Sequence, residues 1–385
     1  MSASEVLYVG VNDHEIDLFE GQFKVPNGMS YNSYVIKDEK IAVMDSVDAH
    51  FADEWLDQIA AACDGKSPDY LVVSHMEPDH SGSINAFMKA YPNATIVLNA
   101  KSDSMVTNYF GTDYPAENMI VKNGDTLELG EHTLTFVFAP MVHWPEVMLS
   151  YDSFDKCLYS ADAFGQFGAL DVDLLWAAEA RRYYFGIVAP YGKQVQMMFK
   201  KLEPFDIQMI RPLHGPVLED MLDHYMDAYK TWSAYEPEQR GVLIAYASIY
   251  GHTAKAALKL AETLRKQGIQ VVVQDLARCD EAQAVADAFR FSHMICAASS
   301  YNGGVFPFMR NFLQDLEEKK YQKRTVGFIQ NGTWAPSATK TMKALLENCT
   351  NITFMDEETT IRGSVNAESQ SELDALTTKL IAELK

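Results

Sequence analysis

Four side chains that can bind a metal ion lie within six residues of one another in the first quarter of the chain. They belong to the segment His75-Met76-Glu77-Pro78-Asp79-His80, so the pattern is H-x-E-x-D-H. A strand-like run at residues 70–73 precedes this segment, and small, turn-prone residues follow it. We therefore predict that the four side chains lie on a loop at the end of a strand, where irregular backbone lets several side chains converge on one point.

Three other residues with metal-binding side chains also follow short strand-like runs. His143 comes after residues 134–138, and His214 comes after residues 208–211. Asp162 lies in residues 159–165, which end another predicted strand. Loops at one edge of a β-sandwich can build a shared site in this way, so we predict a two-metal site. Imidazole and carboxylate together suit zinc, iron or manganese. The candidate ligands are His75, Glu77, Asp79, His80, His143, Asp162 and His214.

The remaining histidines are mostly isolated in the sequence. An isolated histidine is typically a surface residue or a hydrogen-bonded core residue, and we expect that role for His14, His50, His132, His224 and His293.

A second kind of site is indicated by a loop between a predicted strand and a predicted helix in the last third of the chain. Its hydroxyls and its glycine can hold one phosphate on backbone N–H groups at a helix N-terminus, without any Lys or Arg. The loop matches neither G-x-x-x-x-G-K-[ST] nor G-x-G-x-x-G, which disfavours nucleoside triphosphates and NAD. The candidate residues are Ser248, Ile249, Tyr250, Gly251, His252 and Thr253.

Two more loops follow the third and fourth predicted strands of the same region. Parallel sheets bind ligands at the carboxyl ends of their strands, so the three loops should line one site. Gly303 and Gly304 permit close approach of a flat ring, and Trp334 can stack on it. The candidate residues in these loops are Ser300, Tyr301, Asn302, Gly303, Gly304, Asn331, Gly332, Thr333 and Trp334.

The elements that must position these residues fall into two regions. Residues 5–150 favour short strands with helices near 50–63 and 83–91, followed by a helical stretch at 172–201 that is interrupted near Pro190, and a helix at 217–234. The polar segment 236–240 marks a boundary. Beyond it, five apolar strands alternate with helices, which predicts a doubly wound parallel sheet. The expected domains are residues 1–238 and 239–385.

Composition limits the partners and the compartment. The net charge is −21, from 53 acidic and 32 basic residues, and argues against nucleic acid and anionic membranes as partners. Five scattered cysteines fit a reduced cytoplasmic protein without a disulfide framework or an iron–sulfur cluster. The first twenty residues lack a basic region, so we expect no signal peptide, and no apolar run is long enough to span a bilayer.

The pattern around His75 resembles the metallo-β-lactamase fold, in which zinc hydrolases carry H-x-H-x-D-H. Here Glu77 replaces the second histidine, and the H-x-E-x-D-H variant resembles that of flavodiiron proteins. The resemblance implies that His75, Glu77 and His143 hold one iron, that Asp79, His80 and His214 hold the other, and that Asp162 bridges them. The loop at residues 248–253 resembles the T/S-x-T-G-x-T loop of flavodoxin, which binds the FMN phosphate, with Tyr250 in place of a threonine.

The resemblance also implies a fold and an activity. The expected fold class is α/β and α+β in two domains, an αββα metallo-β-lactamase-like sandwich followed by a flavodoxin-like five-stranded sheet. The expected activity is reduction of dioxygen to water, of nitric oxide to nitrous oxide, or of both. FMN would relay electrons to two irons from an external donor, such as rubredoxin or a reduced deazaflavin. Family architecture further implies a head-to-tail homodimer.

Two other functions are compatible with parts of the pattern. One is a zinc-dependent hydrolase with an accessory flavodoxin domain, which Glu77 disfavours because a carboxylate in that place shifts preference from zinc toward iron. The other is an electron-transfer or sensor module without turnover, which the full set of seven candidate ligands disfavours.

Overall fold

The computed structural model describes residues 4–111 and 117–385, which pack as two compact units. The N-terminal unit consists of residues up to 184 together with 191–230, and the C-terminal unit consists of 185–190 together with 231–385. Two short segments that precede residue 239, 185–190 and 231–238, thus pack with the C-terminal unit. The domain boundary at residues 238 and 239 stays a prediction.

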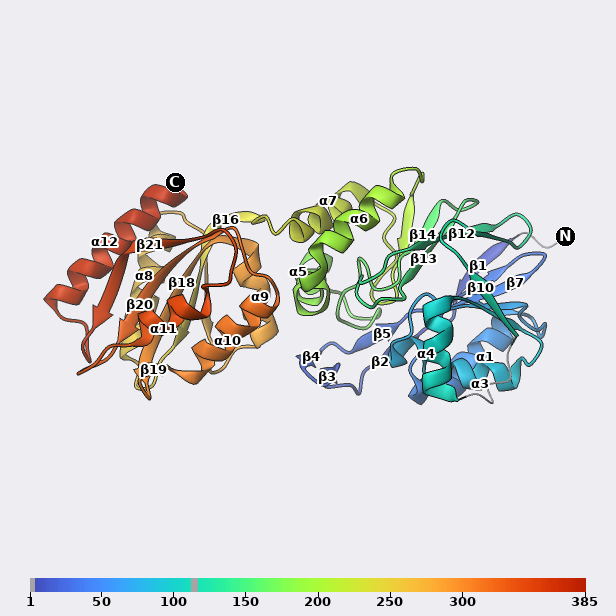
Figure 1. Cartoon of the computed structure of the whole chain (residues 1–385), viewed down its shortest axis with the longest axis horizontal. Helices are drawn as coiled ribbons and strands as arrows, with labels where there is room; N and C mark the ends of the chain where they lie inside the picture. The colour runs from blue at the N-terminus through green and yellow to red at the C-terminus, as the bar shows by residue number, and fades with distance from the viewer. Residues whose placement is uncertain (1–3, 112–116) are drawn as a thin grey trace. The chain divides into compact units, whose positions relative to one another are not determined.

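Two mixed sheets form the centre of the N-terminal unit (Figure 1). The first sheet has, in spatial order, β1 (Glu5–Tyr8), β6 (Tyr34–Lys37), β7 (Ile41–Met44), β8 (Tyr70–Val72), β9 (Thr95–Asn99) and β10 (Glu117–Val121). The second sheet has β11 (Thr126–Glu128), β12 (Thr133–Phe138), β13 (Met148–Asp152), β14 (Cys157–Tyr159) and β15 (Met209–Arg211). Two short ribbons pair β2 (Val11–Asp13) with β5 (Met29–Tyr31) and β3 (Leu18–Phe19) with β4 (Phe23–Lys24).

The two sheets pack face to face. Ile36 and Val72 of the first sheet share one buried apolar cluster with Leu134 and Phe136 of the second. Side chains alternate between the faces of a strand, so Leu134 and Phe136 point to the same side of β12. This cluster is the core of the predicted sandwich.

Helices cover both outer faces of this sandwich, which completes the expected αββα arrangement. The first sheet is flanked by α1 (Ala52–Ala62), α3 (Ile84–Ala90) and α4 (Ala100–Phe110), whereas α6 (Gly192–Leu202) packs on β12 of the second sheet (Figure 1). The other helical segments are η1 (Ala49–Phe51), α2 (Pro78–Ser81), α5 (Trp176–Tyr183), η2 (Tyr184–Val188), η3 (Ala189–Tyr191) and α7 (Leu222–Ser233).

Two helices differ from the sequence-based expectation. The helix predicted at 217–234 begins only at Leu222, because Leu218 pairs with Ile210 through two backbone hydrogen bonds of 2.8 and 2.9 Å. The helix α4 was not predicted. Its N-cap is Asn99, whose side-chain oxygen accepts from the backbone N–H groups of Lys101 and Ser102, a capping signal that is present in the sequence.

A parallel sheet with helices on both faces forms the C-terminal unit. Its spatial order is β17 (Val271–Asp275), β16 (Gln239–Ala247), β18 (Phe291–Tyr301), β20 (Arg324–Asn331) and β21 (Ile352–Ile361), with β19 (Gly304–Val305) turned back antiparallel on β18. The order of the five strands, 2-1-3-4-5 in chain numbering, is that of flavodoxin-like folds. The predicted doubly wound sheet is confirmed.

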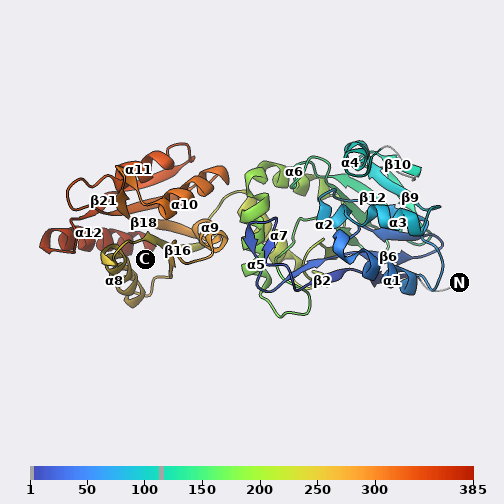
Figure 2. The ribbon, with the colours of Figure 1, turned by 90° about the horizontal axis from the view of Figure 1, so that it is seen from below.

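Each of the five strands is followed by a helix, as expected from the alternating pattern. The helices are α8 (His252–Lys266), α9 (Glu281–Arg290), α10 (Pro307–Glu318), α11 (Ala338–Leu345) and α12 (Ala367–Leu384). Within this unit, α8 and α12 lie on one face of the sheet, and α10 and α11 lie on the other (Figure 2). Among the described residues, no helix has both the length and the apolar character needed to cross a membrane.

Candidate metal and flavin sites

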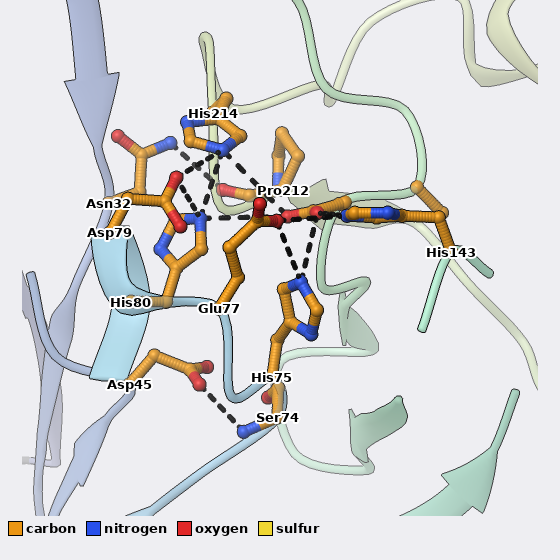
Figure 3. A network of polar contacts seen from close by, with 12 residues as sticks. Asn32, Asp45, Ser74, His75, Glu77, Asp79, His80, His143, Pro212 and His214 are labelled. Atoms are coloured by element: carbon orange, nitrogen blue, oxygen red, sulfur yellow. Dashed lines mark hydrogen bonds and ion pairs between the residues drawn. The ribbon is translucent and has the colours of Figure 1, made fainter. Parts of the chain in front are cut away.

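The seven predicted metal ligands come together in the N-terminal unit as two adjoining groups of ligand atoms (Figure 3). His75, Glu77, His143 and Asp162 form the first group, and Asp79, His80 and His214 form the second. Within each group the ligand atoms all lie within 4.8 Å of one another. We call these the first and the second metal group.

The first metal group brings two imidazoles and two carboxylates together. His143 Nε2 lies 2.8 Å from Asp162 Oδ2 and 3.1 Å from Glu77 Oε2. His75 Nε2 lies 3.2 Å from the same Glu77 oxygen and 3.5 Å from the same Asp162 oxygen. Two imidazole nitrogens and two carboxylate oxygens therefore converge on one point.

The second metal group is built around a pair of imidazoles. His80 Nε2 and His214 Nε2 are 2.9 Å apart, and each lies 3.3 Å from Asp79 Oδ2. The other oxygen of Asp162, Oδ1, faces this group at 3.6 Å from His80 and 3.8 Å from His214. The two oxygens of Asp162 are thus directed at different groups.

A short helix separates the ligands of the H-x-E-x-D-H segment. We predicted that all four lie on a loop, and this is wrong for Asp79 and His80, which lie on α2. Pro78 fits the first turn of a helix because its missing N–H needs no partner there. Glu77 precedes α2 in an extended conformation, with φ −61° and ψ 140°. The change from extended to helical backbone sends Glu77 to the first group and Asp79 and His80 to the second.

The buried carboxylates need positive charge nearby. Among the described residues, neither oxygen of Asp79 or of Asp162 has a hydrogen-bond partner, and only imidazoles approach them as ion pairs. Burial acts to raise the pKa of Asp162, but the charges of His75 and His143 outweigh it and hold that pKa well below its usual range. Burying such groups without partners is costly, and coordination of cations by both groups would satisfy them. The residues therefore fit a pair of metal ions.

The same competition sets the pKa values of other ligands. For Glu77, burial acts to raise the pKa, but hydrogen bonds and charges from His143 and His75 lower it to about 2. For His80, burial dominates and lowers the pKa to about 4. A carboxylate that stays ionised and an imidazole that stays neutral are both in the form that binds a metal ion.

Three groups outside the predicted set orient the ligands. Glu146 Oε1 lies 2.8 Å from His75 Nδ1, and the backbone oxygen of Ser30 lies 2.7 Å from His214 Nδ1. Asn32 donates to the backbone oxygens of Pro212 and Gly215, which fixes the loop that carries His214 (Figure 3). Sequence reasoning missed all three, because nothing local marks a contact such as His75–Glu146, which spans 71 residues.

Aromatic rings close the space around the metal groups. Tyr31 meets His80 and His214 edge-on at 6.3 and 6.0 Å between ring centroids, and Trp144 meets His75 at 5.2 Å. Tyr183 lies against His214 at 5.6 Å. Packing of this kind limits the motion of the imidazoles.

The isolated histidines include one buried pair outside this centre. His132 is buried, and its Nδ1 lies 2.6 Å from Asp152 Oδ2. His132, Asp152 and Asp155 also form a small cluster of ligand-type atoms. The direct His132–Asp152 contact fits the expected role of a hydrogen-bonded core residue.

A cavity of about 350 Å³ lies at the carboxyl ends of the parallel strands in the C-terminal unit. All three predicted loops line it, and 13 of the 15 predicted residues contribute; the exceptions are Gly251 and Gly304. Four lining residues were not predicted, namely Ser299, Ala335, Ser337 and Gly363. Trp334 and Tyr250 are each 90% exposed at its rim.

Two of the predicted residues stabilise the conformation of these loops. Gly251 adopts φ +86° as the N-cap of α8, a left-handed conformation that favours glycine. Ser300 is the second-last residue of strand β18 and does not lie in a loop. Its hydroxyl accepts hydrogen bonds from the backbone N–H groups of Ser337 and Ala338. The flavin loops are therefore held together by their own hydrogen bonds.

Comparison with known proteins agrees with this architecture. Residues 29–215 match the family model described as ODP family beta lactamase, and residues 243–385 match the flavodoxin domain. The chain is 30% identical to rubredoxin-oxygen oxidoreductase of Megalodesulfovibrio gigas over 87% of this chain and 85% of that protein. The crystal structure of the flavodiiron protein from Giardia intestinalis superposes with a TM-score of 0.90 and 26% identity, covering 98% of this chain and 95% of that one.

The chain belongs to the flavodiiron protein family. Another similar relative is the anaerobic nitric oxide reductase flavorubredoxin of Klebsiella pneumoniae, 28% identical over 90% of this chain and 74% of that protein. Family membership confirms the predicted resemblance and both predicted folds of this flavodiiron chain. The alternative of a zinc hydrolase with an accessory flavodoxin domain is not favoured by these relatives.

Proposed function

We propose that this flavodiiron protein is an oxidoreductase that reduces dioxygen to water, nitric oxide to nitrous oxide, or both. The observation that carries the proposal is the pair of metal groups with one carboxylate, Asp162, directing an oxygen at each. Such an arrangement suits two metal ions that share a bridging ligand and leave positions open for a small gas molecule. The names of the relatives, which refer to oxygen and nitric oxide, support the same reaction class.

In this proposal the seven residues divide as the geometry suggests. His75, Glu77 and His143 would hold one iron, Asp79, His80 and His214 would hold the other, and Asp162 would contribute an oxygen to each. Glu77 supplies an anionic oxygen where zinc hydrolases have a nitrogen, and this favours iron. Two ferrous ions and a reduced flavin, when bound, supply the four electrons that dioxygen needs, or the two that join a pair of nitric oxide molecules.

The C-terminal cavity is the proposed FMN site. The residues from Ser248 to Thr253 would receive the phosphate at the N-terminus of α8 with neutral donors. The loops at Ser300–Gly304 and Asn331–Trp334 would hold the ring, and Trp334 offers an aromatic face for stacking. Because these loops belong to the C-terminal unit and the metal ligands belong to the N-terminal unit, loss of one flavin contact should weaken FMN binding without removing iron.

The proposal extends to partners and compartment. A rubredoxin-type protein is the proposed electron donor, since rubredoxin appears in the names of two relatives, and a reduced deazaflavin is a second possible donor. We further propose a head-to-tail homodimer, in which FMN of one chain serves the irons of its partner. The cytoplasm is the proposed compartment, supported by five cysteines that are all unpaired.

Metal analysis and gas reduction test the proposal together. Protein produced with iron should contain two irons and one FMN per chain. Under anaerobic conditions, with a reduced donor, it should consume dioxygen or nitric oxide, and a sedimentation measurement should give a dimer. Two zinc ions per chain with hydrolytic turnover, or full iron and FMN without consumption of either gas, would contradict it.

A further inference from the structure

Glu146 is a buried carboxylate that contacts the outer nitrogen of His75, a member of the first metal group. It is only 1% exposed, and Oε1 contacts both His75 Nδ1 at 2.8 Å and the backbone N–H of Met76 at 2.9 Å. Asn99 donates to the backbone oxygen of Glu146. The carboxylate is thus fixed relative to the ligand segment from which His75 extends, and it leaves His75 Nε2 directed at Asp162 and Glu77.

In the part of the chain that the structure describes, no carboxylate contacts the Nδ1 atoms of the imidazoles in the second metal group. The partner of His214 Nδ1 is the neutral backbone oxygen of Ser30 at 2.7 Å. His80 Nδ1 is buried and has no hydrogen-bond partner among the described residues. The two groups therefore differ in the charge of the partner at the outer imidazole nitrogen, Nδ1, although each offers a similar set of ligand atoms.

We propose that Glu146 is a positioning residue for His75 and makes the first metal group the tighter of the two metal sites. This inference rests on the proposed function, because it takes both groups to bind metal. A carboxylate on the outer nitrogen of a ligating histidine fixes which nitrogen faces the metal and makes that nitrogen a stronger donor. Loss of such a partner typically lowers metal affinity by about 10- to 100-fold.

The missing hydrogen bond at His80 Nδ1 also favours tighter metal binding at the first metal group than at the second. Within the described residues no hydrogen bond holds this Nδ1, and the ring packs edge-on against Tyr31 at 6.3 Å between ring centroids. A ligand without an outer hydrogen bond is a weaker donor and reorients more easily. Metal should therefore enter the first group before the second and leave it last.

Stepwise metal binding tests the inference without gas reduction. Metal-free protein with FMN bound is titrated anaerobically with Co²⁺ in competition with a chromophoric chelator, and the visible spectrum of each bound ion is recorded. The native chain should bind two ions in steps that differ at least about tenfold in affinity. In Glu146→Gln, affinity at the first metal group should fall by about 10- to 100-fold and the spectrum of its ion should change. The ion of the second metal group, recognised by its unchanged spectrum, should bind as in the native chain, and FMN content should stay the same.

Asp152→Asn is the matched control. Asp152 is also a fully buried carboxylate in the same unit, and it likewise accepts from one histidine Nδ1 and one backbone N–H, those of His132 and Phe154. A purely structural loss of a buried carboxylate would affect both variants alike, so Asp152→Asn should leave both binding steps in place.

Three results would overturn the inference. They are equal affinities for both ions in the native chain, weaker binding at the second metal group in Glu146→Gln, and the same loss in Asp152→Asn. The native titration decides the order of binding even if a variant fails to fold. A native chain that binds two ions stepwise but reduces neither gas would instead contradict the proposed function and leave the unequal sites standing.

Discussion

At the scale of single residues, we expect Glu77 to have the largest influence on the chemistry of the metal centre. It is the one position at which the ligand segment departs from the zinc hydrolase pattern, and in the structure its Oε2 lies within 3.2 Å of both His75 and His143. A nitrogen ligand there would remove one negative charge from the first metal group. A carboxylate oxygen favours iron, whereas an imidazole binds zinc as well as iron. The side chain at position 77 should therefore control which metal the site retains.

Replacement of Glu77 by histidine should weaken iron binding and gas reduction while FMN content stays intact. The expected loss in iron affinity is about tenfold or more, since a first ligand changes rather than an outer one. Iron and FMN per chain are measured together with the rates of gas consumption. Glu54→His, at an exposed position on α1, serves as the control. Full iron and normal gas reduction in Glu77→His would show that this residue does not select the metal.

At the scale of elements, strand ends and helix starts bring the reactive residues to their places. The same backbone change that begins α2 divides the ligands between the metal groups. In the C-terminal unit, the turn at Gly251 begins α8 at the edge of the flavin cavity. Turns of this kind tolerate few substitutions, because a side chain in the left-handed region is strained even where space is free.

Gly251→Ala should lower FMN affinity, whereas Gly268→Ala should not. Both glycines have positive φ, 86° and 78°, and no atom would lie within 4 Å of an added Cβ at either position. Each substitution should cost about 1–2 kcal/mol of stability through backbone strain. Only Gly251 lies between two residues that line the flavin cavity, Tyr250 and His252, so FMN titration should separate the two variants. Equal FMN affinity in both would argue against phosphate binding at this turn.

The pair His132–Asp152 joins the start of β12 to the end of β13 and predicts a pH dependence. Burial acts to lower the pKa of His132, but the hydrogen bond to Asp152 and the charges of Asp152, Asp155 and Asp38 together raise it. A histidine with a raised pKa stabilises the fold fully below its unfolded value of about 6.5, and this contribution is lost as pH rises through the folded pKa.

His132→Gln should therefore lose more stability at pH 6 than at pH 9. The expected difference is about 1 kcal/mol, the size of one hydrogen bond to a charged group above a neutral one. Urea unfolding at the two pH values measures it. His50→Gln, whose side chain is 89% exposed, should show no such difference. A larger loss at pH 9 in His132→Gln would reverse the assigned sign.

At the scale of the whole molecule, the C-terminal unit includes chain segments from before the predicted boundary. Phe185 stacks on Phe289 at 4.1 Å between ring centroids, and the Tyr235 hydroxyl donates to the backbone oxygen of Ala189. The guanidinium of Arg324, which is 2% exposed, donates to the backbone oxygens of Tyr235 and Phe289. One buried cation thus ties the segment 231–238 to the parallel sheet.

Arg324→Met should destabilise the C-terminal unit by about 3 kcal/mol, because it leaves several buried carbonyl oxygens without their donor. FMN should be released at a lower temperature, and hydrogen exchange should speed up in residues 231–238, while iron content stays unchanged. Arg265→Met, on the exposed side of α8, loses one solvent-accessible contact and should change little. Equal behaviour of the two variants would show that Arg324 does not anchor this segment.

The sequence by itself determined the residue types and the local elements. The H-x-E-x-D-H spacing, the positions of His143, Asp162 and His214, the three flavin loops and the alternating strands and helices were all legible, because motif spacing and hydrophobic periodicity are local properties. They were sufficient to predict the family, both folds and the seven side chains that the structure brings together.

Only the tertiary structure decided how those residues are divided and supported. The two oxygens of Asp162 face different groups, α2 separates Glu77 from Asp79, and Glu146 stands behind His75 across 71 residues. Contacts of this kind depend on how sheets and loops pack, and no short-range pattern records them. Burial also sets which carboxylates need a cation, since the cost of an unpaired charge arises only after water has been removed.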